Sequence, residues 1–279
     1  LQGKVIRAVG EPKERFTEDA LRIMRAVRFS AQLGFTIDEK TYEALAELSP
    51  NLKHISAERI QVELVKILTS KHPEYLEAAW ETGITRVILP EFDAMMEPAQ
   101  NTPHHCYDVG RHALVSLMAV PADKVLRLTM LLHDVGKPVV RTTDEQGQDH
   151  FKGHEDVGER MASEILKRLK MDNDTISKVC RLIHWHDYQP VAVEKGIRRA
   201  VNRVGEDIFP FLLQVQLADT MAKSDFGREK RLEQITKTQQ IYEGILEANQ
   251  CLSLKSLAVT GKDLIAMGMQ PGKGIGQML

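Results

Sequence analysis

The sequence predicts an all-α protein, and three observations support that prediction. Apolar residues recur at three- and four-residue spacing along almost every stretch, which is the pattern of a helix with one buried face; one such series is Leu21, Met24, Val27 and Ala31. The apolar–polar alternation typical of strands is nearly absent. Turn residues such as Gly34 separate the periodic stretches by short connections, as helical bundles prefer.

Composition narrows the class of protein further. The chain has 279 residues, of which 43% are hydrophobic and 27% charged, so it is long enough for two domains and a substantial core. A formal net charge of −2 excludes a globally basic nucleic-acid binder. Any polyanion must therefore be held by local patches of positive charge.

The apolar runs, the cysteines and the first residue indicate where the protein is located and whether the chain continues. No apolar run approaches the ~20 residues that a membrane span requires, and no signal-peptide pattern is present. Cys106, Cys180 and Cys251 lack motif spacing, which indicates reduced thiols and a cytoplasmic protein without a membrane partner. The first residue is Leu1 rather than Met, which predicts that the protein continues before it.

The first long helix is expected to start at Thr17, a residue type that caps helices, with Glu18 and Asp19 in its first turn. Asp19 and Arg22 would then be neighbours on one helix face. A solvated ion pair is the simplest interpretation of that spacing. The alternative is a base-reading pair, because an Asp acceptor beside an Arg donor complements the edges of adenine and cytosine and opposes those of guanine and uracil.

Turn-rich segments divide the chain into three expected units. The polar, Pro-bearing segment 96–103 is the best boundary between a helical neck and body at 1–100 and a second domain at 101–227. A boundary near Phe226 separates that domain from a helical tail at 228–279. Within the second domain, segment 146–151 is rich in Gly, Gln and Asp and is expected to be a mobile loop.

The second domain contains most of the histidines. Eight of the ten lie between His104 and His186. His133 and Asp134 stand inside the apolar run 128–135, where burial of two polar groups costs several kcal/mol unless something binds them. His112 and Asp219 also border apolar residues, on separate helical segments. Imidazole and carboxylate ligands without a thiolate cluster suit a catalytic divalent ion such as Mn, Fe, Ni, Co or Mg.

The order His112, His133-Asp134, Asp219 resembles the HD phosphohydrolase superfamily, and the stretch Leu132-His-Asp-Val-Gly-Lys-Pro is its most specific part. The resemblance implies that these four residues hold one metal ion, and that His154 and His186 are candidate ligands of a second. We favour His186 over His184, because residues two apart cannot share a helix face. Surface or structural roles are expected for His104, His105 and His150.

Such a site implies hydrolysis of a phosphoester or phosphoanhydride, with His133 and Asp134 at its centre. Lys137 is a candidate clamp for a phosphate. An equally weighted alternative is that Lys137 caps the end of a helix, because Gly136 and Pro138 flank it and cations favour that end.

The amino-terminal stretch Gly10-Glu-Pro-Lys-Glu-Arg-Phe-Thr-Glu-Asp-Ala-Leu-Arg resembles the neck of class II tRNA nucleotidyltransferases, the CCA-adding enzymes, and of bacterial poly(A) polymerases. The resemblance covers essentially the whole chain, including Ser56-Ala-Glu-Arg-Ile, Leu89-Pro-Glu-Phe and the tail motif Thr260-Gly-Lys-Asp-Leu. It implies that Asp19 and Arg22 select ATP and CTP and that tRNA or another RNA is a partner. For the glycine-rich turn 272–276, an approach to tRNA and a glycine-bounded helix end are equally weighted.

The family's catalytic head, with its Gly-Ser motif and paired Asp residues, has no counterpart here, since no Asp-x-Asp lies on a plausible strand. Nucleotidyl transfer depends mainly on metal-held charge neutralisation, so this chain alone is not expected to extend tRNA. The expected function is therefore a portion of a tRNA nucleotidyltransferase or poly(A) polymerase family protein with a metal-dependent phosphohydrolase domain. The alternatives are a stand-alone HD nucleotide phosphohydrolase and a catalytically silent RNA-binding module. The pattern does not specify the oligomeric state.

Overall fold

The computed structural model describes residues 3–97, 108–248 and 261–278. It is 69% helical and 3% strand, which confirms the all-α prediction. The strands among the described residues are two short pairs: β1 (Val5–Ile6) beside β2 (Thr36–Ile37), parallel, and β3 (Thr142–Thr143) beside β4 (Asp149–His150), antiparallel. None of the described helices has the length and apolarity needed to cross a membrane.

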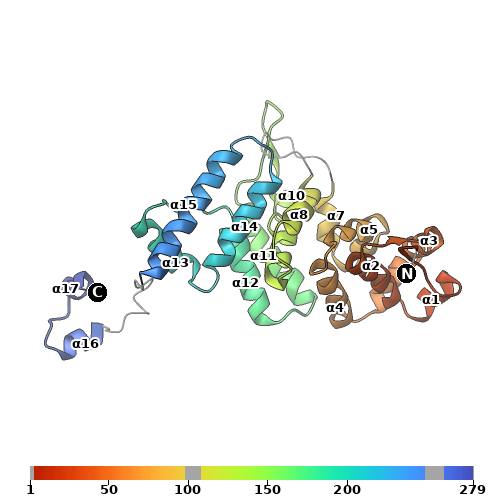
Figure 1. The fold of residues 1–279 in the computed structure, drawn as a ribbon, viewed down its shortest axis with the longest axis horizontal. Helices are drawn as coiled ribbons and strands as arrows, with labels where there is room; N and C mark the ends of the chain where they lie inside the picture. The colour runs from red at the N-terminus through yellow and green to blue at the C-terminus, as the bar shows by residue number, and fades with distance from the viewer. Residues whose placement is uncertain (1–2, 98–107, 249–260, 279) are drawn as a thin grey trace.

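The amino-terminal third is a cluster of short helices at one end of an elongated molecule (Figure 1). Helices α2 and α4 pack together at its centre, and their buried apolar residues, such as Ile23, Met24 and Leu64, form its core. The cluster consists of α1 (Pro12–Glu18), α2 (Leu21–Leu33), α3 (Glu39–Leu48), α4 (Ala57–Leu68), α5 (Leu76–Glu81), α6 (Ile84–Ile88) and α7 (Pro90–Met95), with 3-10 turns at Ser49–His54 and Pro73–Tyr75.

The expected continuous helix from Thr17 is wrong. Helix α1 starts at Pro12, whose fixed backbone suits a first helical turn, and ends at Glu18 because Asp19 adopts an extended conformation, with φ −146°. Thr17 lies inside α1, where its hydroxyl donates to the carbonyl of Lys13. A new helix, α2, then begins at Leu21. Asp19 and Arg22 are therefore separated by a helix break.

A buried ion pair connects α2 to α4. The guanidinium of Arg28 lies 2.9 Å from the carboxylate of Glu63, and the two side chains are 12% and 5% exposed. Arg25 adds a longer contact of 4.0 Å to the same carboxylate. Because burial of charges is tolerated only when they are paired, Glu63 balances the arginine-rich face of α2.

We expect Glu63→Ala to destabilise the protein by about 3 kcal/mol, since it leaves Arg28 buried without its counter-charge. Urea denaturation followed by circular dichroism measures the change. The matched control is Glu18→Ala, which removes a solvent-exposed partner of Arg22 and should change the free energy of unfolding much less than Glu63→Ala does. Equal effects of the two substitutions would contradict the assignment of Glu63 as a buried structural charge.

The middle of the molecule is a bundle in which α9 packs against α8 and α12, and α11 packs against α12. Its apolar core includes Leu117, Met130, Leu166 and Ile183. Figure 1 shows this bundle between the amino-terminal cluster and the tail. It consists of α8 (Val109–Met118), α9 (Lys124–Leu132), α10 (Lys137–Val140), α11 (His154–Arg168), α12 (Asn173–Trp185), α13 (Glu194–Val204) and α14 (Phe209–Ala222).

Two local expectations for this bundle need correction. The apolar run 128–135 is not one helix, because α9 ends at Leu132 and His133 is its C-cap residue. Segment 146–151 is not simply a loop, since its residues 149 and 150 form β4, which pairs with β3. The Asp144 carboxylate accepts hydrogen bonds from the amides of Gln146 and Gln148 and shapes the hairpin turn. Cys180 is a buried free thiol, while Cys106 and Cys251 lie outside the described residues.

The tail begins with the long helix α15 (Arg228–Glu247), which packs against α14 and α13. Two short helices, α16 (Gly261–Ala266) and α17 (Lys273–Met278), follow beyond residues 249–260. The helical tail that the sequence predicts is therefore present. One of the two equally weighted interpretations of the glycine-rich turn 272–276 was a glycine-bounded helix end, but Gly274 and Gly276 lie within α17. Most of the expected boundary segment 96–103 falls outside the described residues.

Candidate metal centre

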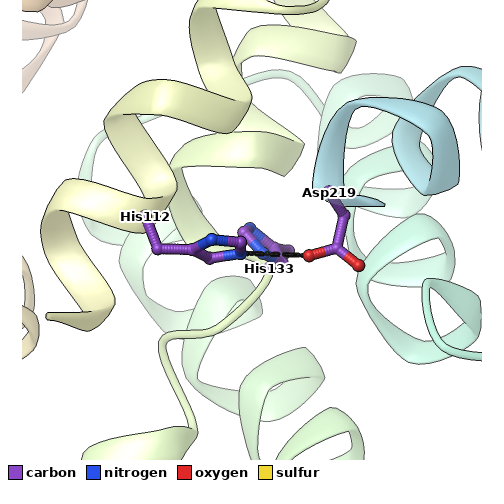
Figure 2. A group of neighbouring side chains, drawn as sticks. All are labelled: His112, His133 and Asp219. Atoms are coloured by element: carbon purple, nitrogen blue, oxygen red, sulfur yellow. Dashed lines mark hydrogen bonds and ion pairs between the residues drawn. The ribbon is translucent and has the colours of Figure 1, made fainter. Parts of the chain in front are cut away.

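Four buried side chains from three separated segments converge in the bundle. The Nε2 atom of His112, on α8, lies 3.2 Å from Nε2 of His133, at the end of α9, and 3.0 Å from Oδ1 of Asp219, on α14. Figure 2 shows these three side chains pointing toward one another. Oδ2 of Asp134 completes the group, at 3.6 Å from His112 Nε2 and 3.3 Å from His133 Nε2. Each of the four residues is at most 1% exposed.

A second group shares Asp134 with the first. Its other carboxylate oxygen, Oδ1, lies 3.6 Å from Nε2 of His154 and 3.7 Å from Nε2 of His186. The two imidazole nitrogens are 3.2 Å apart. His154 begins α11 and His186 follows the last residue of α12, so two further helix ends reach the same place. The carboxylate of Asp134 therefore stands between two sets of histidines.

Backbone carbonyls orient the histidine rings. Nδ1–H of His133 donates to the carbonyl of Met130 at 2.8 Å, that of His186 to Ile183 at 2.6 Å, and that of His154 to Phe151 at 2.9 Å. Each acceptor is the carbonyl three residues earlier, and those of Met130 and Ile183 lie in the last turns of α9 and α12, where carbonyls can accept a hydrogen bond from a side chain. Because Nδ1 carries the proton in these contacts, Nε2 is the atom that each ring offers to the centre.

The donor set fits a divalent ion. Two ligand atoms that are each about 2.1 Å from one ion lie about 3.0–3.4 Å apart at right-angled or tetrahedral geometry, and the separations within both groups are close to that range. Oδ1 of Asp134 is buried and has no hydrogen-bond partner. An acceptor left in that state is costly unless a cation faces it. This oxygen faces the second pair of histidines, so a bound cation would satisfy it.

The electrostatics of the centre also indicate a place for positive charge. Burial disfavours a charged His133, but the carboxylates of Asp134 and Asp219 outweigh burial and raise its pKa to about 10. Burial would raise the pKa of Asp134, yet His133 and Lys137 hold it well below its usual value. Burial lowers the pKa of His112 and His186. A cation entering the centre would therefore take the place of the proton on His133.

Two lysines contact the buried carboxylates. Nζ of Lys137 lies 2.7 Å from Oδ2 of Asp134, and Nζ of Lys223 lies 2.6 Å from Oδ2 of Asp219. Lys137 begins α10 and is 5% exposed, so the interpretation of this residue as a helix C-cap is wrong. Both lysines line a cavity of about 500 Å³ that also reaches His154. They can therefore contact both the centre and a molecule in the cavity.

Lys223 and Asp187 also belong to the site, although neither was predicted from the sequence. Oδ2 of Asp187 lies 3.5 Å from His154 Nε2 and 3.7 Å from His186 Nε2, which makes it a third side chain beside the second group. Its signal was its place directly after His186 in Trp185-His-Asp. For Lys223 the signal was its position four residues after Asp219, directly after the last residue of the apolar helix α14, where it can reach back to that carboxylate.

The remaining histidines lie apart from the centre where they are described. His184 points to the other side of α12 and contacts Asp156 at 3.2 Å and Glu159 at 3.0 Å. His150 is exposed and pairs with Asp144 at 2.7 Å, in keeping with the expected surface role. His104 and His105 lie outside the described residues.

The structure does not bring Asp19 and Arg22 together as a pair. The Asp19 carboxylate accepts from the amide of Leu21 and contacts Arg59 at 3.4 Å. The Arg22 guanidinium donates to Glu18 at 2.7 Å and to the carbonyl of Arg15. Arg22 also lines a cavity of about 290 Å³ with Arg15, Arg25 and Phe29. The physical reason that the two side chains do not pair is the helix break at Asp19. Without a continuous helix from residue 19 to residue 22, they do not lie on one helix face.

Two family models match parts of this chain. Residues 34–96 match the family described as a probable RNA and SrmB-binding site of polymerase A, and residues 103–224 match the HD domain. An A-adding tRNA nucleotidyltransferase of Deinococcus radiodurans is 31% identical over 100% of this chain and 66% of its own length. A CC-adding tRNA nucleotidyltransferase of Thermus thermophilus is 30% identical over 96% of this chain and 62% of its own.

Solved structures show the same fold at lower identity. The Bacillus stearothermophilus CCA-adding enzyme in complex with CTP has a TM-score of 0.56 and 21% identity, covering 99% of this chain and 59% of that one. The Thermotoga maritima CCA-adding enzyme complexed with tRNA has a TM-score of 0.51 and 16% identity, covering 99% and 58%.

The fold and the centre define the class: an all-α protein with an HD domain in which buried histidines and aspartates lie close enough together to hold a metal ion. Its two family matches and its relatives place it more narrowly, and the chain belongs to the tRNA nucleotidyltransferase family. It spans about 60% of the length of the relatives named above.

Proposed function

We propose that the HD domain is a metal-dependent phosphohydrolase that acts on nucleotides or RNA ends. The observation that carries this proposal is the shared carboxylate of Asp134, with one oxygen toward His112 and His133 and the other toward His154 and His186. A divalent ion held there would lower the pKa of a bound water and neutralise phosphate charge. Candidate ions are Mg, Mn, Ni, Co and Fe.

The chain's own residues supply binding and orientation in this proposal. Lys137 and Lys223 stand where the cavity meets the centre, so their ammonium groups can bind phosphate oxygens. The carbonyls of Met130, Phe151 and Ile183 hold the imidazoles in position. Asp187 is half-exposed beside His154 and can accept a proton from a group in the cavity.

The direct test is the metal content of the purified protein, followed by a panel of phosphoesters. The panel contains nucleoside 2′,3′-cyclic phosphates, nucleoside 2′-phosphates and free nucleotides. We expect one or two equivalents of a divalent ion and hydrolysis of at least one class. Zero metal and no hydrolysis would favour the alternative of a silent RNA-binding module.

We further propose that the longer protein takes part in tRNA 3′-end processing and uses ATP or CTP. Relatives that are A-adding, CC-adding and CCA-adding enzymes support this, as do CCA-adding enzymes of similar structure in complex with CTP, ATP or tRNA. The match at 34–96 supports RNA as a partner. Nucleotidyl transfer would need a catalytic head with paired aspartates on a strand. The Asp172-x-Asp174 pair of the described residues does not fit that role, because it lies at a helix start: Asp172 caps α12 and Asp174 pairs with Lys178.

Three units are proposed within this chain: a neck and body at 1–100, the HD domain at 101–227 and a tail at 228–279 that contacts tRNA. The family matches at 34–96 and 103–224 support the first two. The end of α14 at Ala222 and the start of α15 at Arg228 support the second boundary. If the alternative of a stand-alone HD phosphohydrolase were correct, the same polypeptide would contain no nucleotidyltransferase head.

Base selection by Asp19 and Arg22 gives a prediction for the longer protein. We expect Arg22→Ala, in a protein that also carries the nucleotidyltransferase head, to relax the choice among the four nucleoside triphosphates by about tenfold or more. Incorporation of each nucleotide into a tRNA lacking its 3′ end measures the choice. Arg15→Ala is the matched control, because Arg15 lines the same cavity and also contacts Glu18. Retained selectivity for A and C in Arg22→Ala would contradict the base-reading role.

A further inference from the structure

The cavity beside the metal centre has a second wall that the HD domain match does not include. That match ends at residue 224, yet Phe226, Arg228 and Arg231 line the cavity together with Lys137 and Lys223. The two arginines belong to the first turn of α15. The tail helix therefore contributes directly to the surface that a ligand of the HD domain would meet.

Arg231 lies on the side of α15 that faces the bundle. Farther along the same helix, at spacings of three and four residues, this side carries Ile235, Thr238 and Tyr242, and all three are buried. Nη2 of Arg231 is itself buried and has no hydrogen-bond partner, and the same is true of Nε of Arg228. Because a buried cationic donor without an acceptor is costly, this wall is suited to an anion.

The other cations of the cavity are already engaged. Lys137 contacts Asp134, and Lys223 contacts Asp219, both within the metal centre. Arg228 pairs with Asp225, which is 94% exposed, and donates to the carbonyl of Lys223. Asp149 also lines the cavity, but it pairs with Arg141 at 2.8 Å. In addition, two arginines in the first turn of a helix oppose its dipole, and a bound anion would relieve that repulsion.

Resting on the phosphohydrolase function proposed above, we propose that Arg231, assisted by Arg228, binds a second phosphate of the substrate that is not hydrolysed. A guanidinium matches two phosphate oxygens at once, which suits this role. Phe151 and Phe226 line the same cavity and offer aromatic surface to the nucleoside between the two phosphates. The site would thus take a nucleoside flanked by two phosphates, as in a nucleoside 3′,5′-bisphosphate or a 3′-phosphorylated RNA end.

The test compares adenosine 3′-monophosphate with adenosine 3′,5′-bisphosphate as substrates of the metal-loaded protein. We expect Arg231→Gln to lower kcat/KM for the bisphosphate by about tenfold or more through KM, and to leave the monophosphate within about twofold. Lys230→Gln is the matched control, because Lys230 is the neighbouring residue of equal charge, is exposed and does not line this cavity. Arg231→Lys should restore part of the loss.

A 3′-phosphorylated adenosine dinucleotide separates the two sources of the second phosphate. Faster hydrolysis of the dinucleotide than of the bisphosphate assigns the site to RNA ends, and the reverse order assigns it to free nucleotides. An equal loss for monophosphate and bisphosphate in Arg231→Gln, or the same loss in Lys230→Gln, would overturn the proposal.

A calorimetric measurement of ligand binding tests the phosphate subsite independently of hydrolysis. Protein treated with a chelator is titrated with each of the two adenosine phosphates, and the bisphosphate should bind about tenfold more tightly in a manner that depends on Arg231. If the metal-loaded protein hydrolyses no phosphoester, the phosphohydrolase proposal fails while this Arg231-dependent difference still supports a phosphate subsite. Equal affinity for both ligands would reject the subsite whatever the hydrolysis assay shows.

Discussion

His133→Ala should abolish hydrolysis of phosphoesters by the HD domain. The substitution removes the Nε2 atom that lies 3.2 Å from His112 Nε2 and 3.3 Å from Asp134 Oδ2, and with it one side of the first ligand group. Loss of residues that merely orient metal ligands costs 10–100-fold in metal affinity or activity, so loss of a ligand should exceed about 100-fold. Metal content by elemental analysis and kcat/KM on the phosphoester panel measure both effects.

His184→Ala is the control, because His184 is a histidine on α12 whose partners, Asp156 and Glu159, lie away from the centre. It should leave metal content and hydrolysis unchanged. Asp134→Asn removes the charge of the side chain and keeps its size. It therefore distinguishes the effect of losing a ligand from the effect of creating a cavity in the core. Nucleotide binding by the amino-terminal helices should persist in His133→Ala. Unchanged hydrolysis in that variant would show that the assigned chemistry is wrong.

Gly136→Ala should separate the two ligand groups and destabilise the bundle. A Cβ at Gly136 would lie 2.7 Å from the amide nitrogen of Gly158 and would also clash with the backbone carbonyl of His154. Both obstacles are backbone atoms of α11, so relief requires the helix to move. Overpacking of this kind costs about 1–3 kcal/mol. Because α11 carries His154, we also expect a loss of metal from the second group.

Thermal denaturation and metal stoichiometry test this expectation together. Gly244→Ala is the matched control: Gly244 lies in α15, and a Cβ there would have no atom within 4 Å. It should be neutral or stabilise the protein by up to about 1 kcal/mol, because Ala favours helix more than Gly. A Gly136→Ala protein with unaltered Tm and full metal content would show that the turn containing Gly136 does not need to approach α11 so closely.

Much of the centre could be predicted from the sequence because its signals are local. His133 and Asp134 are adjacent polar residues in an apolar run, and His112 and Asp219 each stand among apolar neighbours. Because burying such groups is costly unless something binds them, polar residues within apolar runs can be recognised as candidate ligands from the sequence. The choice of His186 over His184 followed from the family resemblance together with the rule that residues two apart cannot share a helix face, and the structure places His186 beside Asp134. In contrast, the expected helix over Thr17–Arg22 failed, because one extended residue at Asp19 interrupts the periodic pattern.

Other parts of the site could not be predicted because they depend on packing between distant segments. The pairing of Lys223 with Asp219, four residues earlier, has a local signal, but only the approach of α14 to α8 and α9 brings this pair into the centre beside the cavity. Arg231 belongs to a charged stretch that would suit a solvated face. The packing of α15 against α14 turns it toward the metal centre.

The amino-acid sequence by itself determined the helical class, the family resemblance and the identity of the six candidate ligands, because periodicity and motif order are properties of neighbouring residues. Only the tertiary structure decided that Asp134 stands between two histidine pairs, that Asp19 and Arg22 take different partners, and that α15 forms a wall of the cavity. The physical reason is that the relative position of two helices is set by the fit of their buried side chains, and a pattern within either helix carries no record of that fit.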